Sequence, residues 1–258
     1  MGAAHVWRVT LAPPASWPSS LRLAPGEQAH ADRLRNEEGR NRWICSRLAL
    51  RTIVAAYCEC EQGEIRFEQG PFGKPRLAEN GRGASRVHFN LTRSGDLCLV
   101  AVSRDYPVGI DVERLDGAGG EDLIARRFFT SREAEWIARL EGQPKNKAFL
   151  EIWTRKEAYL KATGLGLQPS LGDVDVSPSE NSPGIHSIAG PSSTTWRLIP
   201  LFPAAGYVAT LALPLASTGD GNGDIEMKTF RFAQELGFSS RDASWQREII
   251  GSGQERRT

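Results

Sequence analysis

Two stretches decide how this sequence is interpreted: Gly109-Ile110-Asp111-Val112-Glu113 and Trp153-Thr154-Arg155-Lys156-Glu157-Ala158-Tyr159-Leu160-Lys161. The first stretch is apolar and β-branched around two carboxylates, which is typical of a strand. Because side chains alternate along a strand, Asp111 and Glu113 are predicted to project from the same face.

The second stretch is predicted to be helical. Within it, Trp153, Glu157 and Lys161 recur every four residues and therefore share one face of the helix. If both stretches lie together in the fold, three carboxylates and a lysine converge. Carboxylate oxygens suit hard divalent cations and an ammonium suits phosphate, so the two stretches suggest a site for a divalent cation and a phosphate.

The bulk composition is that of an ordinary soluble globular protein. Of the 258 residues, 40% are hydrophobic and 24% are charged, and the formal net charge is +1. So small a net charge gives no field that favours nucleic acid or an anionic membrane. No apolar run approaches the roughly 20 residues that span a bilayer, and the N-terminus lacks a signal-peptide pattern. Four cysteines without metal-site spacing fit reduced thiols, so we expect a cytoplasmic protein.

The segment from residue 33 to residue 51 is locally basic. It could bind a multiply phosphorylated small molecule, or it could be a solvated helix face, and composition alone favours the second reading. The basic residues are Arg33, Arg35, Arg40, Arg42, Arg47 and Arg51.

Periodicity and turn residues predict short strands and longer helices along the chain. Helices are predicted over residues 31–58, 121–129, 131–140 and 147–163. Thr130 or Ser131 with Glu133 forms a capping box, and Gly164 ends the last helix. Loops are predicted over residues 70–75, 92–96, 143–146 and 177–193. Strands are predicted over residues 5–11, 65–67, 87–91, 97–102, 108–112, 174–176, 196–199 and 207–213.

The predicted organisation is an N-terminal subdomain over residues 1–106, a C-terminal subdomain over 107–216 and a polar extension over 217–258. The two halves each mix helix with short strands. They share no alignable repeat, although a similar order of elements allows a pseudo-symmetric pair. The extension contains one weak amphipathic stretch over 230–236, and it is expected to be loosely ordered beyond residue 239.

With these motifs in order, the chain resembles the 4′-phosphopantetheinyl transferase superfamily, most closely its monomeric surfactin-synthetase type. The two main motifs lie about forty residues apart, and matching segments extend the resemblance over about residues 42–166. The paired motifs are specific, whereas a Gly-Lys-Pro element alone is weak. The additional segments are Phe72-Gly73-Lys74-Pro75, Phe89-Asn90-Leu91-Thr92-Arg93-Ser94-Gly95 and Arg127-Phe128-Phe129-Thr130 with Glu133.

The resemblance implies a fold and an activity. The fold would be α+β, with two similar subdomains in a pseudo-twofold arrangement and the active site in the cleft between them. The activity would be Mg²⁺-dependent transfer of 4′-phosphopantetheine from coenzyme A to a serine of an apo acyl or peptidyl carrier protein. Adenosine 3′,5′-bisphosphate would be released, as in a holo-[acyl-carrier-protein] synthase. The protein would act as a monomer, in fatty acid, polyketide or nonribosomal peptide synthesis.

The resemblance also implies roles for individual residues at the metal end of the site. Asp111, Glu113 and Glu157 would bind Mg²⁺, and Glu157 would also act as the base. Lys161 would contact the phosphates and stabilise the departing group. The alternatives are an edge-strand Asp-x-Glu that faces solvent and an ordinary surface pair between Glu157 and Lys161. Lys156 would touch substrate, carrier or only solvent, and Trp153 is interpreted as a packing anchor.

At the coenzyme end, Lys74, Thr92 and Arg93 are predicted to reach the phosphates, with Arg42 and Arg47 as weaker candidates. Arg93 stands where a histidine is usual in the family. An arginine binds phosphate bidentately and is always charged, so we expect retained anion binding with less dependence on pH. The alternative is that Arg93 points outward and the pocket is weaker.

Two competing functions follow from the same residues. The first is a Mg²⁺-dependent phosphodiesterase that acts on a nucleotide, and the upstream phosphate-binding elements argue against it. The second is a non-catalytic protein that only binds coenzyme A or carrier, and the intact set of carboxylates and Lys161 argues against that.

Overall fold

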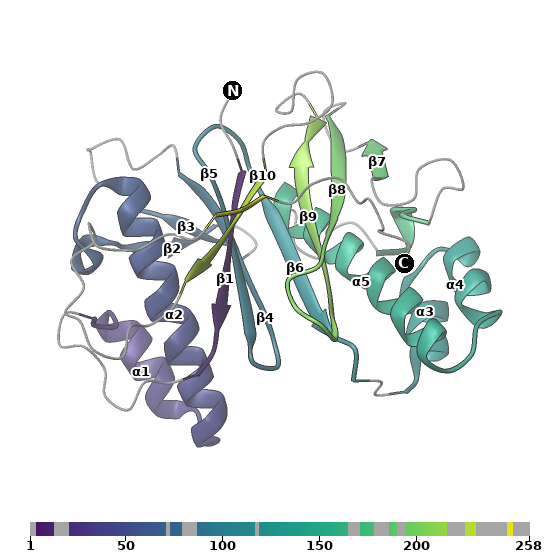
Figure 1. Ribbon diagram of the computed structural model, residues 1–258, viewed down its shortest axis with the longest axis horizontal. Coiled ribbons are helices and arrows are strands. Elements are labelled where there is room, and N and C mark those ends of the chain that lie inside the picture. The colour runs from purple at the N-terminus through teal and green to yellow at the C-terminus, as the bar shows by residue number, and fades with distance from the viewer. Residues whose placement is uncertain are drawn as a thin grey trace.

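Two sheets lie between two long helices in the computed structural model (Figure 1). The structure describes residues 4–12, 21–70, 73–78, 87–116, 119–164, 171–177, 186–189, 194–215, 225–230 and 247–249. The helices are α1 (Pro25–Arg33), α2 (Glu37–Cys58), α3 (Glu121–Phe128), α4 (Ser131–Ala138) and α5 (Gly142–Thr163), with 3₁₀ turns at Gln62–Glu64 and Leu171–Asp173.

The first sheet has the strand order β11-β10-β1-β5-β4, and the second has the order β6-β9-β8-β7. A separate hairpin joins β2 and β3. All neighbours pair antiparallel except β1 and β10, which are parallel. The strands are β1 (Ala4–Thr10), β2 (Phe67–Gln69), β3 (Pro75–Leu77), β4 (His88–Ser94), β5 (Leu97–Ser103), β6 (Gly109–Arg114), β7 (His186–Ala189), β8 (Thr195–Leu201), β9 (Tyr207–Pro214), β10 (Ile225–Phe230) and β11 (Arg247–Ile249).

Strand β5 contributes side chains to the cores on both faces of the first sheet. Every residue of β5 is buried, so its alternating side chains serve two different cores. Cys98, Val100 and Val102 join a core with α2, whereas Leu97 and Leu99 face a core shared with the second sheet. The order of layers is therefore α2, first sheet, second sheet and α5 (Figure 1).

The two halves resemble each other in their parts. Each half carries one helix of 22 residues, α2 in the first and α5 in the second, packed on a mainly antiparallel sheet. Their edge strands β4 and β6 meet at the boundary between the halves, where side chains of β4 bond to β6. The predicted α+β fold with two similar subdomains is confirmed, and the boundaries after residues 106 and 216 stay a prediction.

The predicted helix over residues 31–58 is wrong in one respect, because it is two helices. Helix α1 begins at Pro25, before the start of the predicted helix, since proline is favoured at the first helical position. Helix α2 begins after Asn36, whose side chain accepts a hydrogen bond from the Gly39 amide at 2.9 Å. It ends at Glu59, which has a left-handed backbone (φ 54°).

Of three predicted helix boundaries in the second half, one is wrong and two are confirmed. The break over 143–146 is part of α5, because Pro144 lies in the first turn, where no hydrogen bond from its nitrogen is needed. The capping box of Thr130 with Glu133 is confirmed, with the Thr130 hydroxyl accepting from the Glu133 amide at 3.2 Å. The end of α5 at Gly164 is also confirmed, and this glycine has a φ of 68°.

Three further expectations about local structure are wrong. Residues 174–176 form no strand, because Lys156 of α5 donates to the Val174 carbonyl and Glu133 of α4 accepts from the Val176 amide. The turn predicted over residues 92–96 begins only after Ser94, so Thr92 and Arg93 lie within β4. The loop predicted over 177–193 contains β7.

The segment after residue 216 contributes to the first sheet. Strand β10 pairs with β1 and β11 pairs with β10, a contribution that the polar composition of this segment did not signal. The amphipathic stretch expected over 230–236, apart from its first residue, lies outside the described residues, as does most of the segment beyond 239. Among the described helices, none is both long and apolar enough to cross a membrane.

Candidate active site

Alternate residues of β4 hold the edge of β6 across the boundary between the halves. The Oδ1 atom of Asn90 accepts from the Ile110 amide at 2.8 Å, and Thr92 Oγ1 donates to Asp111 Oδ1 at 2.9 Å. Ser94 Oγ donates to a Glu113 carboxylate oxygen at 2.8 Å. Because residues two apart share a face of a strand, these three side chains form one row that faces β6.

The alternation predicted for the first motif is observed. Ile110 and Val112 point into the core between the sheets, whereas Asp111 and Glu113 face the opposite way, toward β4 and α5. Gly109 allows α5 to approach β6 closely, so that Asp111 and Glu113 face that helix. A Cβ atom added at Gly109 would lie 2.0 Å from the backbone oxygen of Ala158, so β6 and α5 touch through their backbones here.

Asp111 is the most enclosed carboxylate of the site, and only 3% of it is exposed. Its Oδ1 accepts from Thr92 and lies 2.5 Å from Lys161 Nζ. Its Oδ2 is buried and has no hydrogen-bond partner among the described residues. Burial raises the pKa of this carboxyl, and the Lys161 ammonium and the Thr92 hydroxyl oppose that shift.

Glu113 and Glu157 are only partly buried and lie near Asp111. Burial raises the pKa of Glu113, a shift that the hydrogen bond from Ser94 opposes and the charge of Asp111 increases. Burial likewise raises the pKa of Glu157, opposed by Lys161 and increased by Asp111. Both glutamates therefore feel the charge of Asp111, which indicates a concentrated negative charge that a cation would relieve.

The residues present fit a divalent cation, although their side chains do not form a complete coordination shell. No group of three or more ligand side chains is drawn together at metal-binding spacing in the parts of the chain that the structure describes. A buried carboxylate oxygen without a partner is costly, and a hard cation is the ligand that carboxylates take up most readily. The unpartnered Asp111 Oδ2 is therefore the observation that favours a metal here.

Three arginines were predicted to serve the coenzyme end, and they differ in their partners. Arg42 pairs with Asp96 at 2.6 Å and with Glu38 at 2.8 Å. Arg47 pairs with Glu27 at 2.7 Å and lies over the Phe67 ring. Both guanidinium groups therefore already have carboxylate partners.

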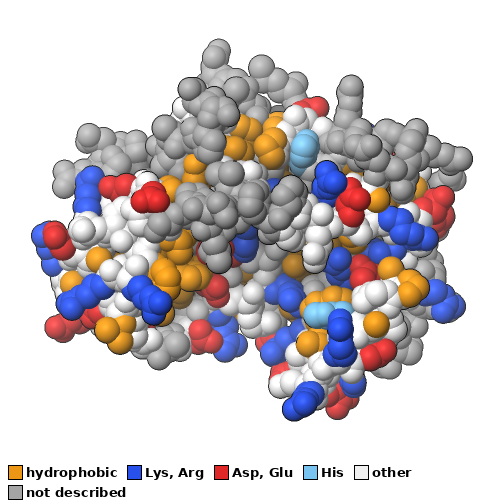
Figure 2. All heavy atoms as spheres, turned by 180° about the vertical axis from the view of Figure 1, so that it is seen from behind, with side chains coloured by type: hydrophobic (Ala, Val, Ile, Leu, Met, Phe, Trp, Pro, Cys, Tyr) orange, Lys and Arg blue, Asp and Glu red, His pale blue; other side chains and the backbone are white. Residues whose placement is uncertain are grey.

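Arg93 is exposed on the other face of β4, and its Nη1 lies 3.4 Å from Ser46 Oγ. No carboxylate lies within ion-pair distance of Arg93 among the described residues. Figure 2 shows Lys and Arg side chains, in blue, gathered over the lobe that contains α1 and α2. Arg93 is therefore the arginine of this end that has its charge available for an anion.

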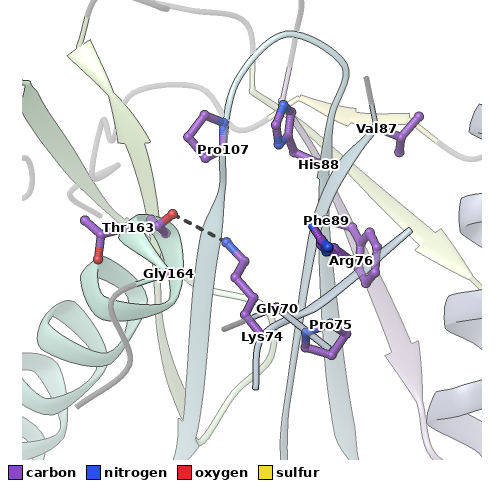
Figure 3. Close-up of a pocket in the computed structure, with 11 residues that line it drawn as sticks. Gly70, Lys74, Pro75, Arg76, Val87, His88, Phe89, Pro107, Thr163 and Gly164 are labelled. Carbon is purple, nitrogen blue, oxygen red and sulfur yellow. Dashed lines mark hydrogen bonds between the residues drawn. The ribbon is translucent and has the colours of Figure 1, made fainter. Parts of the chain in front are cut away.

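A pocket of about 270 Å³ opens between the two halves, beside the β4 row of Asn90, Thr92 and Ser94. Lys74, His88 and Phe89 line it from the first half, and Thr163 and Gly164 line it from the end of α5 (Figure 3). Lys74 extends across the pocket, and its Nζ lies 3.1 Å from the Val108 carbonyl oxygen. The predicted contact between Lys74 and a phosphate stays a prediction, since its ammonium is directed at backbone carbonyls.

Lys156 does not reach substrate, carrier or solvent, so that expectation is wrong. Its side chain is 1% exposed, and its Nζ lies 2.7 Å from Glu133 Oε2 and 2.6 Å from the Leu171 carbonyl. Lys156 and Glu133 form a buried ion pair that fixes the chain after α5. Trp153 packs beside Phe129 and Phe149, which confirms its interpretation as a packing anchor.

The sequence reasoning missed two residues of the site, Asn90 and Ser94. Both lie in the segment that resembles a family motif, where Asn90 was expected in a strand and Ser94 in a turn. The alternation of polar residues at 90, 92 and 94 was the signal that could have identified them.

Comparison with known proteins agrees with this geometry. The family model "4′-phosphopantetheinyl transferase superfamily" matches residues 107–212, and the model "4′-phosphopantetheinyl transferase, N-terminal" matches residues 12–105. The 4′-phosphopantetheinyl transferase HetI of Nostoc is 35% identical over 215 residues, which cover 81% of this chain and 86% of HetI.

More distant relatives carry related names. The 4′-phosphopantetheinyl transferase Sfp of Bacillus subtilis is 25% identical, over 60% of this chain and 66% of Sfp. The human L-aminoadipate-semialdehyde dehydrogenase-phosphopantetheinyl transferase is 29% identical, over 52% of this chain and 47% of its own length.

The fold thus has two α+β subdomains with a candidate active site between them, and the family matches show the class of transferase. The chain belongs to the 4′-phosphopantetheinyl transferase superfamily. Enzymes of this superfamily use coenzyme A, generally with Mg²⁺, and act on carrier proteins.

Proposed function

We propose that this chain transfers 4′-phosphopantetheine from coenzyme A to a serine of an apo carrier domain and releases adenosine 3′,5′-bisphosphate. The observation that carries the proposal is the cluster across the boundary of the halves. There Thr92 and Lys161 both bond to Asp111 Oδ1, while Oδ2 has no partner in the described part of the chain. This cluster provides a metal end and a phosphate end within one cleft.

Asp111, Glu113 and Glu157 would hold Mg²⁺ at the metal end. When bound, the cation would neutralise charge on the pyrophosphate of coenzyme A. Thr92 and Ser94 orient two of these carboxylates through the hydrogen bonds that their hydroxyls donate. Preorganised carboxylates lose little free energy to reorientation when a ligand binds, which favours tight and specific binding.

In the transfer step, the hydroxyl oxygen of the carrier serine attacks the phosphorus that bears pantetheine. A new P–O bond forms, and the bond from that phosphorus to the bridging pyrophosphate oxygen breaks. The bonding electron pair leaves with adenosine 3′,5′-bisphosphate. Glu157 accepts the serine proton, directly or through a water. Lys161 stabilises the charge on the departing phosphate.

At the coenzyme end, we assign phosphate contact to Arg93 in place of the usual histidine. Its guanidinium is exposed and is not paired with a carboxylate among the described residues. Arg42 and Arg47 would have to exchange carboxylate partners for phosphate, so they are weaker ligands. The Thr92 hydroxyl donates to Asp111, so Thr92 would act near the phosphates by orienting that carboxylate.

The carrier would dock near α3. This helix exposes Leu123 and Phe128 together with Arg126 and Arg127. An apolar patch flanked by cations fits a carrier domain that is acidic around its serine. We further propose holo-[acyl-carrier-protein] synthase-type activity of a cytoplasmic monomer, with fatty acid, polyketide and nonribosomal peptide carriers as candidate substrates.

The test is to incubate the protein with coenzyme A, Mg²⁺ and several apo carriers and to measure the mass of each carrier. Transfer predicts a mass gain equal to one phosphopantetheine group, which Asp111→Ala abolishes. A protein that binds coenzyme A without adding mass to any carrier would be a binder. A protein that hydrolyses a nucleotide without carrier would be a phosphodiesterase. Either result overturns the proposal.

A further inference from the structure

Lys74 connects the two halves of the molecule at one point. It precedes β3 in the first half, and its Nζ lies 3.1 Å from the Val108 oxygen and 3.4 Å from the Ala162 oxygen, both in the second half. Figure 3 shows the side chain extended across the pocket toward the end of α5, where a dashed line marks the bond to Ala162. An ammonium with two of its three hydrogens bound in this way is a crosslink between subdomains.

The Ala162 carbonyl belongs to a position where the backbone needs a donor. Ala162 lies in the last turn of α5, and the last carbonyls of a helix have no partner within the helix. They also carry the negative end of the helix dipole, which a cation stabilises. Val108 directly precedes Gly109, where the backbones of β6 and α5 are in contact. Lys74 therefore bonds to both elements at the point where they touch.

Both elements carry the reactive groups only a few residues further on. Asp111 follows Val108 by three positions along β6, and Lys161 directly precedes Ala162 on α5. A shift of either carbonyl would move Asp111 relative to Lys161, whose charged atoms are only 2.5 Å apart. The position of Lys74 thus affects how Asp111, at the metal end, is aligned with Lys161, at the phosphate end.

We propose that Lys74 is a positioning residue, which fixes β6 against the end of α5 and so holds Asp111 and Lys161 in register for transfer. The proposal rests on the proposed function for its kinetic consequences. It departs from the expectation that Lys74 is a phosphate ligand, because its ammonium is directed at protein carbonyls. Burial of the side chain lowers the pKa of Lys74 to about 8, in keeping with an enclosed ammonium that is still mainly charged at neutral pH.

Lys74→Met tests this, because it keeps the apolar stem that lines the pocket and removes the ammonium. The matched control is Arg104→Met. Arg104 donates to the Tyr57 carbonyl at 2.8 Å in the last turn of α2, so it is a cation at the end of the other 22-residue helix and bonds within the first half. Lys74→Arg tests rescue by a second cation.

Three measurements separate positioning from direct binding. Lys74→Met should lower kcat by about 10- to 100-fold at saturating coenzyme A and Mg²⁺, because small misplacements of reacting groups are this costly. The Kd of coenzyme A without metal should change less than about threefold. Loss of a direct phosphate contact would instead weaken binding tenfold or more, and a tenfold change corresponds to about 1.4 kcal/mol. Amide hydrogen exchange should accelerate in the segment 158–164, and Arg104→Met should change neither kcat nor that exchange.

A Lys74→Met variant with unchanged exchange and kcat, but with coenzyme A bound tenfold or more weakly, would overturn the proposal in favour of a phosphate ligand. If Lys74→Met does not fold, Lys74→Leu, which also lacks a donor, takes its place with the same expected results. A wild type that loads no carrier refutes the proposed function instead, and the exchange data then still decide the role of Lys74.

Discussion

The ammonium nitrogen of Lys161 on α5 lies 2.5 Å from Oδ1 of Asp111 on β6, while Oδ2 of that carboxylate is buried without a partner among the described residues. One oxygen of Asp111 is thus neutralised by the protein and the other is left for a ligand. This division places a lysine that suits phosphate directly beside an oxygen that suits a cation.

Mg²⁺ should stabilise the wild-type protein against thermal unfolding and should not stabilise Asp111→Asn. Binding to the folded state alone adds about 2.7 kcal/mol at a concentration of 100 times Kd. Asn lacks the charge that attracts the cation, so its Tm should not respond. Asp116→Asn is the control, because that carboxylate is exposed and pairs with Arg114. An equal Mg²⁺ response in the Asp111 variant would contradict the metal assignment.

The apparent affinity for Mg²⁺ should fall as the pH is lowered, beginning above the ordinary titration range of a glutamate. Burial raises the pKa of Glu157 from its usual 4.5, so the folded protein takes up this proton before the unfolded chain does. Between the two pKa values the folded state binds more protons, so metal-free stability should increase as the pH falls through this window. Titrating Mg²⁺ at several pH values between about 5 and 8 tests this. A half-saturation that is independent of pH would argue against it.

Coenzyme A binding by the wild type should vary little with pH near neutrality, because Arg93 keeps its charge. Arg93→His should bind progressively less well as the pH rises through about 6.5, where imidazole loses its proton. Loss of one charged hydrogen bond, worth about 1.5–3 kcal/mol, predicts a weakening of about tenfold or more. Isothermal titration from pH 6 to pH 8 measures both proteins. A wild type as sensitive to pH as the histidine variant would place Arg93 outside the site.

Lys156→Met should destabilise the protein by about 3–5 kcal/mol, because it leaves the buried carboxylate of Glu133 without its cation. Adding Glu133→Gln to Lys156→Met should recover part of that loss, because Gln removes the buried charge and keeps an acceptor oxygen for the Val176 amide. Lys147→Met is the control on the same helix, since Lys147 and Glu151 form an exposed pair at 3.9 Å, worth less than about 1 kcal/mol. Denaturant unfolding measures all three variants, and equal losses for the two lysines would refute the structural role of Lys156.

Local periodicity predicted the parts of the site that depend on one element. The alternation along β6 placed Asp111 and Glu113 on one face, and the four-residue spacing along α5 placed Glu157 with Lys161. The capping box at Thr130 and the glycine at the end of α5 were likewise predicted from local signals. Such patterns are properties of a single strand or helix, so a sequence reveals them directly.

The features that the sequence did not predict depend on partners far along the chain. Lys156 looked like a surface residue because nothing local shows that the Leu171 carbonyl and Glu133 enclose it. Residues 174–176 looked like a strand, but Glu133 takes the backbone amide at Val176 that a ladder would have used. Strand β10 has no strong pattern of its own and is defined by pairing with β1. In each case tertiary contacts override local propensity.

The most direct test of the central claim compares the two products of one reaction. Purified protein is incubated with coenzyme A, Mg²⁺ and an apo carrier that it loads, and holo carrier and adenosine 3′,5′-bisphosphate are quantified together. The account predicts equal amounts of both, no bisphosphate when carrier is omitted, and neither product with Asp111→Ala. Bisphosphate formed without carrier, or holo carrier formed at an undiminished rate by the Asp111 variant, would contradict it.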